Sequence, residues 1–140
     1  MTEPRCPQTG LPMVRGVRPM TITYKGHFAT IDMPGWYCDE SGESIHTGED
    51  MVVSDQALNR LKATVEGLLT PENVKRIRKA LKLTQKEAGL IIGGGPNAFQ
   101  KYESGEILVS KAITSALLLL DQNPEGLKVL KAHKGQAQAA

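Results

Sequence analysis

The chain has 140 residues, with 17 Lys and Arg against 15 Asp and Glu and a formal net charge of +2, which suits one or two small domains. It contains no run of 18 apolar residues, and its first ten residues lack the charged-then-apolar pattern of a signal peptide, so we expect no contact with a membrane. Two cysteines do not make a secreted disulfide scaffold, and the expected location is cytoplasmic.

Charge is distributed unevenly between the two halves. Residues 1–67 carry six Lys and Arg against nine Asp and Glu, a net charge of −3, whereas residues 68–140 carry eleven against six, a net charge of +5. An acidic half suits a basic protein partner and a basic half suits phosphate, although solvated faces alone also produce such a difference. We predict an α+β chain with a small β-rich domain over 1–67 and an all-helical domain over 68–140.

The N-terminal domain opens with strand-like sequence. Residues 20–24 and 28–33 have strand composition, and Lys25–His27 between them predicts a hairpin turn. Residues 13–17 predict a further strand. From about residue 49 to residue 66 apolar residues recur every four positions, which predicts a helix with one apolar stripe, formed by Val53, Ala57, Leu61 and Val65.

Cys6 and Cys38 each begin a segment that resembles half of a zinc knuckle. If Thr9 and Ser41 were cysteines, the chain would contain two CxxC pairs, the ligand set of a structural zinc site. A hydroxyl is neutral at pH 7 and hard, which makes it a poor zinc ligand. We therefore expect no metal at these four positions and no other cofactor.

Two alternatives stay open for the cysteines. His27 or His46 would complete a Cys₂His₂ zinc set, although neither has the spacing of a zinc finger. In an oxidant, a Cys6–Cys38 disulfide is the other alternative.

Five helices are predicted in the C-terminal domain. Thr70 caps the first and Pro71 occupies its first position, and Thr84 with Glu87 forms a capping box at the second. The glycines at 93–95 end that helix, because glycine adopts positive φ without cost. The later helices are expected from 96 or 97 to 104, from Ser110 to 120, and from about 124 to 132.

The second and third of these helices have the layout of a helix-turn-helix DNA reader. The third helix carries Phe99 and Tyr102 on one face and projects Asn97, Gln100 and Lys101 from others. Amide and ammonium groups are the chemistry that major-groove edges require. A helical hairpin with a solvated polar face is the alternative.

Residues that open helices in this domain predict phosphate contacts, because free N–H groups and the helix dipole favour an anion there. One such group lies at the start of the second helix and another at the start of the fourth. The residues assigned to the DNA backbone are these helix-opening residues, Thr84, Gln85, Lys86, Ser110 and Lys111, together with Gln100 on the third helix.

The spacing of Cys6-Pro and Cys38, the strand-turn-strand between them and the segment LTQKEA…GGGPNAFQKYESG resemble the MqsA-type antitoxins. These pair an N-terminal zinc-finger domain with a C-terminal helix-turn-helix domain of the XRE type. The resemblance covers about residues 5–130. It implies that residues 1–67 neutralise an MqsR-like ribonuclease toxin, and that residues 68–140 dimerise and repress the chain's own operon.

Base-reading residues and a departure also follow from the resemblance. It implies that an Asn and a basic residue four positions later read bases, which are Asn97 and Lys101 here. The departure is the metal site, because Thr9 and Ser41 stand where family ligands stand.

A homodimer on a palindromic double-stranded DNA operator is expected, because one short helix reads few base pairs and two half-sites lie roughly 34 Å apart. The apolar run at 116–120 exceeds what one helix face needs and suggests the dimer interface. No catalytic arrangement is recognisable, so we expect no enzyme. The alternatives are a stand-alone XRE-family regulator whose N-terminal domain senses redox state or a protein, and a structural adaptor that has lost DNA binding.

Overall fold

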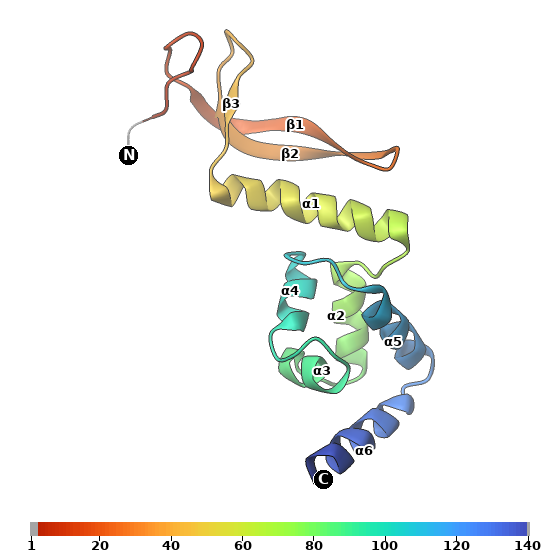
Figure 1. The fold of residues 1–140 in the computed structure, drawn as a ribbon. Helices are drawn as coiled ribbons and strands as arrows, with labels where there is room; N and C mark the ends of the chain where they lie inside the picture. The colour runs from red at the N-terminus through yellow and green to blue at the C-terminus, as the bar shows by residue number, and fades with distance from the viewer. Residues whose placement is uncertain (1–2, 140) are drawn as a thin grey trace. The chain divides into compact units, whose positions relative to one another are not determined.

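The computed structural model describes residues 3–139, with side chains through Lys134. Within that range the chain forms a three-stranded antiparallel sheet followed by six helices, which confirms the predicted α+β class (Figure 1). It divides into two compact units, unit 1 up to Leu61 and unit 2 from Lys62 onward. Among the described residues, no helix is long and apolar enough to span a membrane.

A long hairpin dominates unit 1. Strand β1 (Val14–Tyr24) pairs antiparallel with β2 (His27–Tyr37), and the short β3 (Ser44–Ile45) pairs with the end of β2. The predicted turn is confirmed, with Lys25 at φ +48° and Gly26 at φ +78°, the left-handed conformations that a two-residue hairpin turn requires. The strands predicted at 13–17 and 20–24 are one continuous strand, because β1 lies at the sheet edge, where Pro19 is tolerated.

Helix α1 (Gly48–Glu66) follows the sheet and runs alongside the hairpin over its unit 1 portion (Figure 1). Alternate residues of the hairpin are half-buried or buried, whereas their neighbours, including Val17 and Phe28, are exposed. The apolar stripe predicted for this helix is wrong at its start, since Val53 is exposed and the residues buried there are Asp50 and Ser54. Asp50 is buried because it has an ion-pair partner on β1, described below.

Unit 2 contains the five predicted helices, and their predicted capping residues are confirmed. Thr70, Thr84 and Ser110 each accept a hydrogen bond from a backbone N–H of the following turn. The last helix extends further than predicted, through the tail of the chain. The helices are α2 (Pro71–Ala80), α3 (Gln85–Ile91), α4 (Ala98–Ser104), α5 (Lys111–Gln122) and α6 (Gly126–Ala139).

One apolar core holds these helices together. Its fully buried members come from α2, α3, α4 and α5, so that each short helix is fixed by its inner face. Burying an apolar side chain of this size contributes roughly 1.5–3 kcal/mol, more than a helix of seven residues obtains from its own backbone. The residues at the centre are Val74, Ile77, Ala88, Phe99 and Leu117.

Candidate nucleic-acid interface and remnant metal site

Helices α3 and α4 form a helix-turn-helix whose turn depends on glycine. In the capping box at the start of α3, Thr84 Oγ1 accepts from the Glu87 N–H at 3.1 Å and the Glu87 carboxylate accepts from the Thr84 N–H at 3.0 Å. This pairing lowers the pKa of Glu87. A Cβ on Gly89 would lie 1.8 Å from the carbonyl oxygen of Gly95, so only glycine allows the turn to pack this closely on α3.

Helix α4 has an inward and an outward face. Ala98, Phe99 and Tyr102 are buried in the unit 2 core, and the rings of Phe99 and Tyr102 meet edge to face with centroids 5.4 Å apart. Asn97 and Lys101 are exposed, as is Gln100. Asn97 occupies the N-cap position, but its side chain makes no capping hydrogen bond. The amide is therefore available to a ligand outside the helix.

A buried ion pair fixes α4 against α2. Arg78 Nε donates to Glu103 Oε2 at 2.7 Å, Arg78 Nη2 donates to Glu103 Oε1 at 2.9 Å, and Arg78 Nη1 donates to the Leu83 carbonyl at 2.9 Å. The two side chains are only 11% and 6% exposed. Glu103 raises the pKa of Arg78 despite the opposing effect of burial. The pair thus joins α2, the loop before α3, and the exposed helix α4.

The Arg78–Glu103 ion pair was not predicted from the sequence, although the position of Arg78 indicates a buried charge. Arg78 falls at helical spacing with Val74, Ile77 and Leu81, which makes it a charged residue on an apolar stripe. A charge in that position requires a buried partner of opposite sign. The spacing does not say which of the later carboxylates supplies it.

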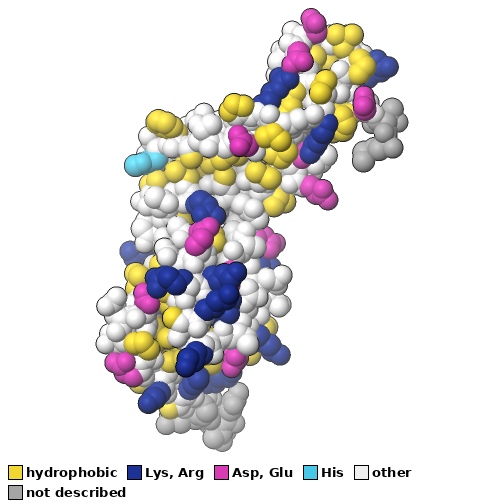
Figure 2. All heavy atoms as spheres, turned by 180° about the vertical axis from the view of Figure 1, so that it is seen from behind, with side chains coloured by type: hydrophobic (Ala, Val, Ile, Leu, Met, Phe, Trp, Pro, Cys, Tyr) yellow, Lys and Arg dark blue, Asp and Glu magenta, His cyan; other side chains and the backbone are white. Residues whose placement is uncertain are grey.

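The residues predicted to contact phosphate differ in what they already bind. Gln85 Nε2 donates to Glu103 Oε1 at 3.3 Å, so this side chain lies against α4 and is half-buried. Lys86 and Lys111 are exposed, and Ser110 Oγ accepts from the Ile113 N–H at 3.1 Å as the cap of α5. Figure 2 shows several Lys and Arg side chains grouped over the visible face of the helical unit.

An apolar groove lies between α5 and α6. Its volume is about 340 Å³, and it contains the end of the apolar run singled out in the sequence. Leu119 and Val129, on its walls, are 68% and 69% exposed, so they form part of one exposed apolar surface rather than scattered single side chains. The lining residues are Ala116, Leu119, Leu120, Gly126, Val129 and Leu130.

The structure brings together Cys6, Thr9, Cys38 and Ser41 of unit 1, which we call the remnant metal positions. Two similar turns, closed by hydrogen bonds from the Gly10 N–H to the Cys6 carbonyl and from the Gly42 N–H to the Cys38 carbonyl, hold the cysteines. Cys6 Sγ lies 3.1 Å from Ser41 Oγ, and Cys38 Sγ lies 3.6 Å from Thr9 Oγ1. The hydrogen bonds from Ser41, and secondarily from Thr9, lower the pKa of the Cys6 thiol to about 6.

These four positions do not fit a structural zinc ion. Zinc sites of this type use four thiolate or imidazole ligands, and here two of the four groups are hydroxyls. The part of the chain with described side chains contains no cluster of three or more His, Cys, Asp or Glu able to hold a metal.

Neither histidine supplies a third ligand to this set. His27 begins β2 and Cys38 follows its end, so the strand separates them by about 30 Å. His46 is engaged elsewhere, with Nδ1 2.8 Å from the Pro34 carbonyl and Nε2 3.0 Å from Ser44 Oγ.

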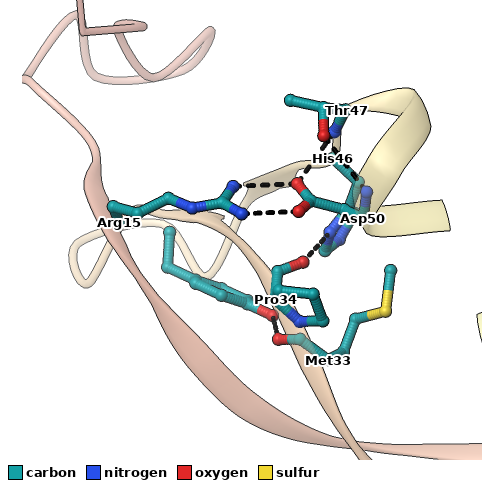
Figure 3. Close-up of polar contacts among 7 residues, drawn as sticks. Arg15, Met33, Pro34, His46, Thr47 and Asp50 are labelled. Carbon is teal, nitrogen blue, oxygen red and sulfur yellow. Dashed lines mark hydrogen bonds and ion pairs between the residues drawn. The ribbon is translucent and has the colours of Figure 1, made fainter. Parts of the chain in front are cut away.

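A second polar cluster joins the sheet to the start of α1 (Figure 3). Arg15 donates twice to the Asp50 carboxylate, at 2.5 and 2.8 Å, and Asp50 also accepts from the Thr47 N–H at 2.9 Å. These hydrogen bonds, those from Arg15 foremost, hold the pKa of Asp50 well below its usual range. Tyr37 completes the cluster by donating to the Met33 carbonyl at 2.5 Å.

A family model described as the antitoxin component of a bacterial toxin-antitoxin system, MqsA, matches residues 1–131. The class of protein is thus an antitoxin, one component of such a system. The chain is 34% identical to antitoxin MqsA of Escherichia coli (strain K12) over 121 residues, 85% of this chain and 92% of that protein. The protein belongs to the MqsA antitoxin family, which confirms the resemblance inferred from the sequence.

A second similarity is shorter. Over 63 residues the chain is 40% identical to the vegetative-specific protein H7 of Dictyostelium discoideum, which covers 45% of this chain and 56% of that protein.

Proposed function

We propose that this antitoxin neutralises a ribonuclease toxin through residues 1–67 and represses its own operon as a dimer through residues 68–140. The observation that carries the DNA-binding half is the division of α4 into a buried apolar face and an exposed face bearing Asn97 and Lys101. Because its buried face fixes this helix in the core, less conformational entropy is lost when its exposed polar side chains bind a ligand.

Asn97 and Lys101 are the proposed base readers. They are four residues apart and therefore lie on the same side of the helix. The Asn97 amide offers a donor and an acceptor in one plane, which pairs with N6 and N7 of adenine. Lys101 reaches guanine or a phosphate as a single charge, without the two-pronged geometry of Arg, so its base discrimination is weaker.

Phosphate contacts are proposed for the N-termini of α3 and α5. Thr84 Oγ1 accepts from its own helix and its side chain also bonds to the Glu87 carboxylate, so a phosphate contact by this hydroxyl would replace the second of these bonds. Lys86 and Lys111 add positive charge beside these helix ends, where the dipole favours an anion. Gln85 is assigned a lesser role, since its amide is already bonded to Glu103.

For the groove between α5 and α6, the proposed occupant is the same groove of a second copy. Leu119 and Val129 project from it, so two copies related by a two-fold axis place apolar walls against each other. Such a dimer presents two copies of α4, as an inverted repeat with half-sites one helical turn apart requires.

The toxin is proposed to bind the hairpin of unit 1. Strand β1 is an edge of the sheet over its full length, and an exposed edge is a template for pairing with a strand of another protein. Val17 and Phe28 add exposed apolar surface, Phe28 at 72%. The net charge of −3 over residues 1–67 favours a basic partner.

Two assays on the full-length chain test the two halves. In the first, the antitoxin is co-expressed with the small protein encoded beside it, and we expect the growth arrest caused by that protein alone to be relieved. In the second, fluorescence anisotropy measures binding to the DNA upstream of the antitoxin gene, at several salt concentrations. Absence of growth arrest or of relief would refute neutralisation, and affinity independent of salt would refute operator binding.

A further inference from the structure

We propose that Cys6 and Cys38 form a reversible intramolecular disulfide in response to a small peroxide, so that the remnant metal site acts as a two-thiol redox site. The inference concerns unit 1 alone and does not depend on the toxin or on DNA. Loss of zinc binding alone does not require the two remaining thiols to stay together inside the protein, yet both are buried in the same site.

The two thiols are interlocked through their neighbours. Each is bonded by the hydroxyl of the opposite turn, Cys6 by Ser41 at 3.1 Å and Cys38 by Thr9 at 3.6 Å. This crossed arrangement places both sulfur atoms between the two turns, where the two cysteines belong to one buried cluster. Two thiols held between the same two turns need only a small movement of either turn to reach the geometry of a disulfide.

Burial determines which oxidant fits. Cys6 and Cys38 are 2% and 3% exposed and belong to one apolar cluster with Met13. A bulky disulfide such as that of glutathione does not reach such a site, whereas hydrogen peroxide is similar in size to water. Two thiols in one enclosed site also favour the disulfide over further oxidation, because the second thiol lies beside the first when it is oxidised.

The proposed chemistry is balanced with peroxide as the two-electron oxidant. The Cys6 thiolate attacks one peroxide oxygen, the O–O bond breaks, and the products are a Cys6 sulfenic acid and hydroxide. The Cys38 sulfur then attacks the Cys6 sulfur, the S–O bond breaks, and the sulfenic oxygen leaves as water. In total, two thiols and one hydrogen peroxide give one disulfide and two water molecules.

A covalent link at this position has a structural consequence. It joins the turn before β1 to the turn after β2, so it closes a loop that contains the entire hairpin. Closing such a loop restricts the unfolded chain and stabilises the folded one. The disulfide thus supplies in oxidant the cross-link that a metal supplies elsewhere.

The test uses the full-length chain, purified under reducing conditions, analysed for metal, and then treated with hydrogen peroxide. We expect no zinc, and a fall from two to zero maleimide-reactive thiols in the denatured chain, reversed by dithiothreitol and without disulfide-linked dimers. The thermal midpoint of unit 1 should rise by several degrees. The matched variant Cys38→Ser should instead accumulate a sulfenic acid on Cys6 that dimedone traps, with no rise in the midpoint.

Three outcomes would overturn the proposal, and they need only the unmutated protein. The first is retention of both thiols at a peroxide concentration that oxidises the urea-unfolded chain. The second is loss of both thiols as sulfinic or sulfonic acids. The third is one zinc per chain that protects both thiols until a chelator removes it.

Discussion

Replacing Glu103 with alanine removes the carboxylate that pairs with the buried Arg78 guanidinium. Two of the Arg78 hydrogen bonds, at 2.7 and 2.9 Å, end on this carboxylate, and the Arg78 side chain is only 11% exposed. An unpaired charge buried in this way costs about 3–5 kcal/mol. A unit of this size has a total stability of about 4–12 kcal/mol, so the loss is a large part of what holds unit 2 together.

Thermal unfolding followed by circular dichroism measures this loss. For a domain of this size each kcal/mol moves the melting temperature by about 4–8 °C, so we expect Glu103→Ala to lower that of unit 2 by about 12–40 °C. Operator affinity should fall as well at temperatures where the variant is still folded, because Glu103 lies on α4. Glu125→Ala removes an exposed carboxylate of the same unit and should change the stability by less than about 0.5 kcal/mol.

A double variant separates charge from shape. Arg78→Met with Glu103→Leu fills a similar volume without charge, and such replacements are neutral or stabilising in other proteins. We expect the double variant to melt near the unmodified protein and well above Glu103→Ala. A Glu103→Ala protein that melts within two or three degrees of the unmodified one would refute the buried-charge reasoning, as would a double variant no more stable than Glu103→Ala.

Five further results are expected. Asn97→Ala should weaken operator binding by about 1–3 kcal/mol per half-site and relax the choice of one base. Lys86→Ala should instead weaken binding to every DNA sequence equally and reduce the salt dependence of the affinity. Fluorescence anisotropy on operator and scrambled DNA distinguishes the two effects. Leu119→Asp should convert the dimer to a monomer in sedimentation, and an unchanged dimer would place the interface elsewhere. Because the pKa of Asp50 is lowered in the folded protein, its ion pair stabilises the fold above about pH 4, and this stabilisation is lost as the pH falls through the folded pKa. The free energies of unfolding measured in urea for Asp50→Asn and the unmodified protein should therefore differ at pH 7 and converge in acid. Chelation by EDTA should leave the thermal midpoint of unit 1 unchanged, and a fall in that midpoint would show a structural metal.

Local features of the fold were predictable because their causes lie within a few residues. The capping box of Thr84 and Glu87 and the positive-φ turn at Lys25 and Gly26 each depend on neighbouring residues alone. The helix-turn-helix was predictable for the same reason, since its glycines directly follow the capped helix. The site residues Asn97 and Lys101 came from the family pattern, and their exposure on α4 is consistent with that assignment.

Long-range pairings were not predictable, since the sequence does not specify which opposite charge a residue meets. Arg15 and Asp50 are 35 positions apart, and the buried position of Asp50 displaced the apolar stripe expected on α1. The crossed hydrogen bonds between the two cysteine turns likewise depend on the register of the β1–β2 hairpin. That register lies beyond the reach of periodicity, which describes one strand at a time.

The most direct test of the proposed division of labour is one full-length variant, Asn97→Ala with Lys101→Ala, measured in both assays. Both side chains are exposed, so the fold should be unaffected. We expect the variant to relieve toxin-dependent growth arrest as well as the unmodified protein does, and to lose repression of a reporter placed behind the upstream DNA. A variant that still represses, or one that no longer relieves the arrest, would contradict the assignment of DNA reading to α4 and of neutralisation to unit 1.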